Sequence, residues 1–219
     1  MSQALMDAMQ ANDVATLRSI IARQPHLVNF RDDQGDSPVL RAIYYGAHDA
    51  AQLLISEGAQ LNVHEAAAVG DVVRVQDALS ADPTALNSLS HDGWTPLHLA
   101  SFFAHEDVAR LLISRGADIH VVSTNRMENL PIHAAAANGK TAVVWLLLDH
   151  GADVNSRSRG WSPLDLAVEN GNEELVALLL SRGADANARS GDGQSPLSRA
   201  AGNGNDGISD LLRQHGASE

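Results

Sequence analysis

The chain of 219 residues contains no cysteine and one lysine, Lys140. The missing cysteines exclude disulfide bonds, thiolate metal sites and cysteine nucleophiles, although they do not identify a cellular compartment. The formal net charge is −12. Because binding to a nucleic-acid backbone needs clusters of basic side chains, this charge disfavours nucleic acid as a partner.

Long apolar runs are also missing. Residues 142–148 form one of the longest apolar stretches, and it is far shorter than the roughly 20 residues that a membrane-spanning helix needs. Residues 1–7 lack the basic start and apolar core of a signal peptide. We therefore expect no membrane segment and a location in the cytoplasm.

A short pattern recurs along the chain. In residues 92–100, Thr95 can cap a helix with its hydroxyl and Pro96 suits the first helical position. The same slot is filled by Ser37-Pro38, Leu130-Pro131, Ser162-Pro163 and Ser195-Pro196, and leucine-rich segments ending in Gly-Ala-Asp cover 111–118, 146–153 and 178–185. The prolines at 96, 131, 163 and 196 lie 35, 32 and 33 residues apart, and a period near 33 predicts a stacked repeat array.

In these motifs the chain resembles the ankyrin repeat family, whose unit has a glycine turn, Thr-Pro-Leu-His, an alanine-rich helix, a leucine-rich helix and Gly-Ala-Asp-Val-Asn. Val154-Asn155 completes that last phrase, and the resemblance covers the whole chain. It implies an all-α solenoid of helix-turn-helix repeats joined by hairpin turns, here called fingers. We expect a single domain, 1–219, with seven repeats at about 1–29, 30–62, 63–87, 88–120, 121–155, 156–187 and 188–219.

Repeats three to six depart from the pattern. Repeat three has no Asp-Gly turn and no Thr-Pro before Val63, so its finger is expected to be missing. The finger of repeat five is about two residues longer than usual and that of repeat six is one residue shorter. Ala104 replaces the glycine between the two helices of repeat four, and we expect a strained turn there. The missing finger predicts a notch between repeats two and four.

Candidate catalytic and cofactor motifs do not have the context that their chemistry needs. Residues 202–207 match GxGxxG, but they follow a helix, whereas a dinucleotide site needs a preceding strand. In our alignment His64, His98 and His133 share one slot of the first helix, where the family's histidine bonds to neighbouring backbone. No metal-binding spacing or nucleophile elbow is present. We expect no enzymatic activity, no metal and no cofactor.

The eight aromatic residues are distributed unevenly within the repeats. The resemblance implies a concave binding face built from the finger residue before Thr-Pro and the two residues before the inter-helix glycine. Six aromatics occupy those positions, and two polar residues on the fingers complete the expected partner-binding set: Tyr44, Tyr45, His91, Trp94, Phe102, Phe103, Arg159 and Trp161. The alternative is that these rings pack between repeats as additional core.

The sequence therefore predicts a monomeric adaptor, inhibitor or scaffold that docks a partner protein or peptide on its concave aromatic face. The partner is not identified by the residues. Arg126, Arg157 and Arg159 make the later fingers basic, whereas the finger before Ser37 is acidic, so a partner of opposite polarity would be steered into register. One alternative is a small-ligand binder or enzyme that uses the notch, with His64, Glu65 and His91 as its polar groups. Another is self-association through the aromatic face.

Overall fold

The computed structural model describes residues 3–218, and regular structure in them is helical apart from one isolated bridge between Ser158 and Trp161. Two short 3-10 helices, η1 (Pro25–Asn29) and η2 (Pro83–Asn87), follow α2 and α6. The α-helices come in consecutive pairs: α1 (Gln3–Gln10) with α2 (Val14–Arg23), α3 (Pro38–Tyr44) with α4 (His48–Ser56), α5 (Val63–Val69) with α6 (Val72–Ala81), α7 (Pro96–Phe102) with α8 (Glu106–Ser114), α9 (Pro131–Ala137) with α10 (Thr141–Asp149), α11 (Pro163–Glu169) with α12 (Glu173–Ser181), and α13 (Pro196–Gly202) with α14 (Asp206–Gln214).

The first helix of most pairs begins as the sequence predicts. Proline occupies the first turn, and the residue before it caps the helix by accepting a hydrogen bond from a backbone N–H of that turn. The caps are Ser37, Thr95, Ser162 and Ser195. Three first helices differ: α1 has no proline, α5 is capped by Asn62 with Glu65 completing a capping box, and Leu130 offers α9 no side-chain cap.

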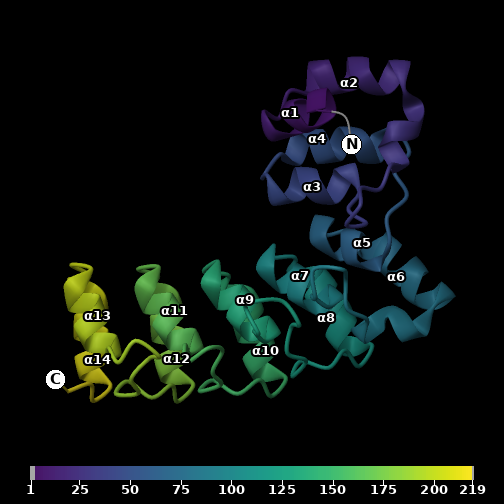
Figure 1. Cartoon of the computed structure of the whole chain (residues 1–219). Coiled ribbons are helices and arrows are strands. Elements are labelled where there is room, and N and C mark those ends of the chain that lie inside the picture. Colours follow the sequence, from purple (N-terminus) through teal and green to yellow (C-terminus); the bar gives the residue numbers. More distant parts are fainter. Residues whose placement is uncertain (1–2, 219) are drawn as a thin grey trace.

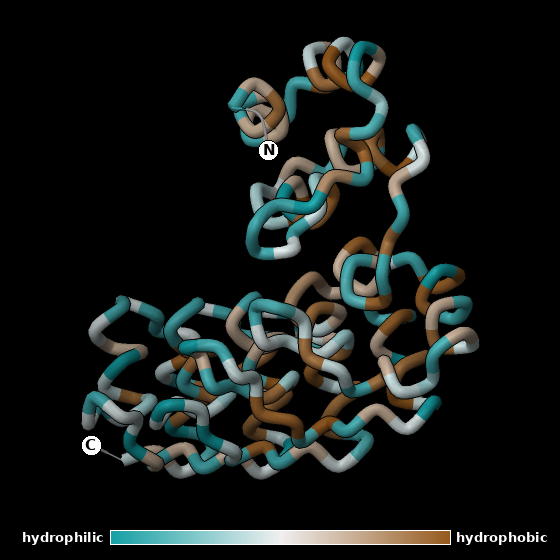
Figure 2. Tube along the Cα trace, turned by 45° about the vertical axis from the view of Figure 1, so that its right-hand side comes forward, coloured by the Kyte–Doolittle hydropathy of each residue, from teal (hydrophilic) through white to brown (hydrophobic). Residues whose placement is uncertain are grey.

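The core runs along the array between two layers of helices. Each first helix packs against the next first helix from α1 to α13, and consecutive second helices pack together from α2 to α4 and from α6 to α14. Alanines such as Ala134, Ala135 and Ala136 are fully buried on the first helices, because small side chains let these helices approach closely. Figure 2 shows the hydrophobic segments inside the row and hydrophilic segments along its turns.

Each finger is closed by a backbone hydrogen bond. The closing pairs are Asp32 N to Asp36 O, Ser90 N to Trp94 O, Ser123 N to Asn129 O, Ser158 N to Trp161 O, and Ser190 N to Gln194 O. Finger five (123–129) is therefore longer than finger four (90–94), and finger six (158–161) is shorter, as predicted. Only residues 57–62 connect α4 to α5, whereas residues 115–130 connect α8 to α9.

The fingers of repeats four to seven stack closely. Thr124 N donates to Gly93 O at 3.0 Å, which joins fingers four and five. Fingers six and seven approach so closely that a Cβ built on Gly160, where φ is +85°, would lie 2.7 Å from the Cα of Gly191. These contacts make the four fingers one continuous edge of the array.

The array turns sharply where the connection is short. Figure 1 shows α7 to α14 standing in a row, with α1 to α4 turned away from that row above α5 and α6. Among the described residues, α4 and α6 share few or no contacts, so the layer of second helices is interrupted at this point. The first helices stay in contact through α3, α5 and α7, and the chain bends about them.

The turn between α7 and α8 has the strain that the sequence predicts. Ala104 adopts φ of +66°, the left-handed conformation that Gly46, Gly70, Gly139, Gly171 and Gly204 adopt in the corresponding turns. A side chain in this conformation costs roughly 1–2 kcal/mol relative to the right-handed region.

Candidate functional site

Four of the predicted aromatic residues form a continuous cluster at the bend, which we call the junction cluster: Tyr44, Trp94, Phe102 and Phe103. Ring centroids lie 5.9 Å apart for Tyr44 and Phe103, 5.0 Å for Phe103 and Phe102, and 4.9 Å for Phe102 and Trp94. Tyr44 ends α3, the two phenylalanines end α7, and Trp94 belongs to finger four. The cluster therefore joins repeat two directly to repeat four.

This arrangement corrects two of our expectations. We expected an open notch with rings on its two sides, but Tyr44 and Phe103 meet across the bend because the short connection brings repeat two over repeat three. We also expected Trp94 to be exposed. It is only 7% exposed, because Phe102 packs on one side of the indole and His98 stacks at 6.2 Å on the other. Trp94 is therefore the buried member of the cluster and packs against Phe102.

The exposed part of this region is formed by other rings. Tyr44 and its neighbour Tyr45 are 39% and 37% exposed, and Phe102 and Phe103 are partly buried. Aromatic side chains with one wet edge and one packed edge are typical of protein interfaces. Tyr44, Phe103 and Phe102 thus form a continuous, partly exposed aromatic surface, and the exposed Tyr45 follows Tyr44 in the chain.

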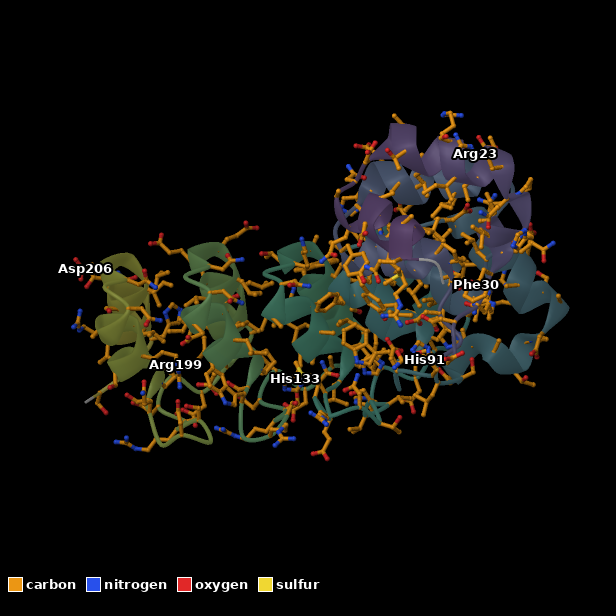
Figure 3. The ribbon with its side chains drawn as sticks, turned by 45° about the horizontal axis from the view of Figure 1, so that its top comes forward. Arg23, Phe30, His91, His133, Arg199 and Asp206 are labelled. Carbon is orange, nitrogen blue, oxygen red and sulfur yellow. The ribbon has the colours of Figure 1, made fainter. Side chains whose placement is uncertain are left out.

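Polar contacts hold the same region together. The Tyr44 hydroxyl donates to Asp92 Oδ2, and His91 Nε2 lies 3.0 Å from Asp36 Oδ1. Arg41 holds Asp36 from the other side at 3.0 Å. Burial raises the pKa of the Asp36 carboxyl, and burial together with the bond to Asp92 raises the pKa of Tyr44 far above its usual value. Figure 3 places His91 where the two parts of the chain meet.

A hollow of about 320 Å³ remains on the finger side of the bend, lined mainly by Arg31, Asn62, His64, Glu65, Ser90 and His91. The carboxylate of Glu65 in this hollow already has hydrogen-bond partners within the protein. Glu65, 1% exposed, receives two hydrogen bonds from Arg31 at 2.8 and 3.0 Å and a third from the N–H of Asn62. His64 Nε2 is bonded to the Ser88 carbonyl at 2.9 Å. The polar groups that the small-ligand hypothesis would use therefore stabilise the protein itself.

The histidine alignment was wrong at one position. His98 and His133 are the third residues of α7 and α9, but the third residue of α5 is Glu65, and His64 is the second. The error arose because Gly70 itself caps α5, whereas Gly46 lies one residue beyond the cap of α3. Counting from the capping residue would have identified Glu65.

Arg159 and Trp161 lie in a second place, which we call the Trp161 hollow. It has a volume of about 400 Å³ and lies between fingers five and six and the helices behind them. Its lining is mostly apolar and includes Met127, Ala137, Trp161 and Leu166, with Arg159 and Glu169 among the polar residues. Sequence reasoning named Trp161 and Arg159 but placed them on the same surface as the other rings.

Arg199, which sequence reasoning missed, fixes the Trp161 ring from behind. Its guanidinium carbon lies 4.2 Å from the ring centroid, and the side chain is almost completely buried. It donates to Glu169 at 2.9 Å and to Asp192 at 2.6 Å. Arg199 is the fourth residue of α13 and is labelled in Figure 3. Arg41 occupies the same position in α3, four residues after the capping serine. An arginine at this position of two first helices, on an otherwise apolar face, was the sequence signal that could have identified Arg199.

The wall of the Trp161 hollow contains an unsatisfied histidine. In α7, His98 Nδ1 accepts from Thr95, and Nε2 contacts the Asn129 carbonyl at 2.9 Å. Leu130 replaces that threonine in repeat five, so His133 Nδ1 has no partner among residues 3–218, although Nε2 reaches the Ser156 carbonyl at 3.2 Å. Burial lowers the pKa of both histidines, to about 4 for His98.

The described residues contain no group of three or more histidine and carboxylate side chains that could hold a metal. The GxGxxG match lies at the end of α13 and in the turn to α14, where Gly204 has φ of +71°. A dinucleotide site requires a strand before this motif, whereas here the motif follows helix α13. Over residues 3–218, none of the helices has the length and apolar character needed to cross a bilayer.

Comparison with known proteins gives one family. A family model of ankyrin repeats, containing three copies of the unit, matches residues 5–123, 120–190 and 157–219. The chain is 27% identical over 176 residues to the probable 26S proteasome regulatory subunit p28 of Saccharomyces cerevisiae, covering 73% of this chain and 76% of that protein. It is 26% identical over 178 residues to the target of rapamycin complex 2 subunit AVO2 of the same yeast, covering 74% of this chain and 41% of the relative. A putative ankyrin repeat protein of fowlpox virus, FPV240, is 35% identical over 101 residues, with 42% of this chain and 25% of the relative covered.

Proposed function

Because the chain belongs to the ankyrin repeat family, whose members bind other proteins, we propose that it docks a partner on its inner face. By inner face we mean the fingers together with the C-terminal ends of the first helices. In this proposal the protein is an adaptor, inhibitor or scaffold without chemistry of its own, acting as a monomer in the cytoplasm.

The observation that carries the proposal is the exposed aromatic surface at the bend. Tyr44 and Tyr45 are exposed, and Phe102 and Phe103 continue the surface across to repeat four. Large rings held by packing lose little conformational entropy when a partner covers them, and for this reason aromatic residues dominate the energetics of many interfaces. Trp94 contributes indirectly by supporting Phe102.

The relatives support the same class of function. Two of them are named as subunits of multiprotein assemblies, the 26S proteasome and target of rapamycin complex 2. A subunit has to recognise other proteins, and a stacked repeat array provides an extended surface for that purpose. The identity of the partner does not follow from the names of these relatives.

The proposal predicts that replacing Tyr45 and Phe102 together with serine reduces recovery of the partner at least tenfold. The reason is the loss of two aromatic contacts, each worth about 1–2 kcal/mol at an interface. Tagged wild type and variant are used for affinity capture from the native cell, and recovered proteins are quantified by mass spectrometry. The matched control is Trp145→Ser, because Trp145 is also an exposed ring, 41% exposed, but lies on α10. Equal recovery by wild type and the double variant, with unchanged helicity, would remove the junction cluster from the proposal.

A further inference from the structure

The later fingers carry basic side chains that the protein itself does not neutralise. Arg126, Arg157, Arg159 and Arg189 are all exposed, and none has a carboxylate oxygen within 4.0 Å among residues 3–218. The chain as a whole has a net charge of −12. Four unpaired arginines on adjacent fingers of an acidic protein form a local region of opposite charge.

The four arginines are held close to one another. Arg159 Nη1 donates to the carbonyl of Arg126 at 2.9 Å, and Arg157 Nη1 donates to the carbonyl of Arg189 at 2.9 Å. These bonds link finger five to finger six and finger six to finger seven. Arg157 Nη1 also donates to the Gly160 carbonyl at 2.7 Å, and Arg189 Nη1 donates to the Gly193 carbonyl at 2.9 Å. A guanidinium has five N–H donors, so most of the donors stay available to an external carboxylate.

The Trp161 hollow lies directly beside this basic strip, because Arg159 belongs to both. Its volume of about 400 Å³ falls in the range of ligand pockets, and its lining is mainly apolar. Met127, 53% exposed, stands at its edge, and Arg199 holds the Trp161 ring in place. A rigid aromatic wall and a flexible methionine suit the burial of one bulky apolar side chain.

Two carboxylates near the hollow are compensated in part: Glu169, which ends α11, and Asp192, which belongs to finger seven. Glu169 and Asp192 both bind Arg199, at 2.9 and 2.6 Å. On the fingers, Glu128 is exposed and next to Met127, and it does not line the hollow. The finger side of the hollow therefore has an excess of positive charge, because the four arginines outnumber the carboxylates Glu128 and Asp192, whereas Glu169 places a negative charge at the end of α11.

We propose that the Trp161 hollow takes a single bulky apolar side chain from an acidic segment of the partner protein, whose carboxylates face Arg126, Arg157 and Arg159. This inference rests on the proposed function and specifies the chemistry of the partner at one place. The acidic residues lie on the finger side of the apolar residue, because Glu169 would repel them on the helix side. The pairing of carboxylates with arginines determines how the segment is positioned along the fingers. The contact of the apolar residue is less sensitive to salt concentration than this pairing.

Synthetic peptides test the proposal without knowledge of the partner. The probe is a 12-residue peptide with one phenylalanine flanked on one side by three glutamates, titrated against the full chain by calorimetry. A second peptide has lysines in place of the glutamates, and a third has serine in place of the phenylalanine. We expect binding in the range of tens of micromolar for the first peptide, and at least tenfold weaker binding for the other two, as charge and apolar contacts are lost.

Variants locate the site. Arg126→Glu with Arg159→Glu is expected to weaken the acidic peptide at least tenfold, and Trp161→Ala to weaken it by a similar factor. Arg110→Glu with Arg115→Glu makes the same charge change on α8 and its C-cap, which do not line the hollow, and is expected to leave affinity within twofold. Helicity by circular dichroism checks that each variant is folded.

Four results would overturn the proposal. One is failure of the acidic peptide to bind, and another is equal binding by all three peptides or by both charge variants. A third is binding of a single-stranded oligonucleotide with the same arginine dependence while the peptide does not bind. The fourth is a concentration-dependent dimer abolished by Arg159→Glu, since that would assign the hollow to the acidic finger two of a second copy. The junction cluster experiment stays valid in each case, so the two proposals fail separately.

Discussion

Lowering the pH from 7 to 4.5 is expected to reduce the free energy of unfolding by about 2 kcal/mol through His98 alone. The side chain is fully buried, and burial lowers its pKa from 6.5 to about 4. Between these two values the unfolded chain binds a proton at His98 and the folded chain does not. The stabilisation is therefore complete above about pH 6.5 and is lost progressively as the pH falls toward 4.

Other histidines add to this effect in the same direction. Burial also lowers the pKa of His64, His105 and His133, each of which is bonded to a backbone carbonyl of a neighbouring repeat. Protonation of these rings in the folded state is opposed by the same burial. Several repeats, and not one local site, should therefore lose stability together.

Urea unfolding followed by circular dichroism at pH 7, 6, 5 and 4.5 measures the effect. The range stops at 4.5 because carboxylates such as Asp192, whose pKa is lowered by bonds from Ser190 and Arg199, titrate at lower pH. His98→Gln is expected to flatten the dependence, whereas His120→Gln, at an exposed position, should not change it. A wild-type midpoint that is the same at pH 7 and 4.5 would contradict the assigned role of the buried histidines.

Replacing Glu65 with alanine is expected to cost about 2 kcal/mol of stability, because the hydrogen bonds between a buried carboxylate and Arg31 are lost together with a helix cap. Glu65 is buried, binds Arg31 with both oxygens and accepts the N–H of Asn62. Because Glu65 lies in the first turn of α5, the substitution should destabilise mainly the helices at the bend. Hydrogen exchange should rise first in α1 to α5, while α9 to α14 retain protection.

The matched control is Glu57→Ala. Glu57 forms an ion pair of similar length with Arg18, at 3.1 Å, but both side chains are exposed. An exposed pair is worth about 1 kcal/mol or less, so this variant should unfold close to wild type. Equal destabilisation by the two variants would mean that the burial of Glu65 has no energetic role at the bend.

The repeat period and the local starts of the helices could be predicted from sequence because they depend on neighbouring residues. Proline in the first turn after a capping hydroxyl predicted α7, α11 and α13, and the positive φ at Ala104 followed from the glycines at the equivalent turns. The lengths of fingers five and six followed from counting residues between recurring motifs. These are local properties that each repeat determines for itself.

The contacts across the bend could not be predicted in this way. A repeat pattern assigns each unit to its immediate neighbours, yet Tyr44 of repeat two meets Phe103 of repeat four. That contact depends on how far the array turns when the connection is short, which is a property of several helices together. Trp94 was assigned as exposed for the same reason, since its position in the finger does not reveal that Phe102 and His98 cover it.

The ion pairs of the buried Glu65 and Arg199 were missed because their partners are distant in sequence. Arg31 and Glu65 are 34 residues apart, and Arg199 and Glu169 are 30 residues apart. Both separations are close to the length of one repeat. A search for opposite charges about one repeat apart would therefore have found both ion pairs. The unsatisfied Nδ1 of His133 was predictable in the same manner, from Leu130 in the place of the capping threonine.

The central claim is that a partner protein covers the inner face at the bend. Site-specific photocrosslinking tests it most directly, with benzoylphenylalanine introduced at position 45 in one variant and at position 145 in another, each expressed in the native cell. Both positions hold exposed aromatic rings, so the probe changes each site to a similar degree. Discrete crosslinked adducts are expected from position 45 and none from position 145. Adducts from position 145 alone, or from neither position while the protein is folded, would contradict it.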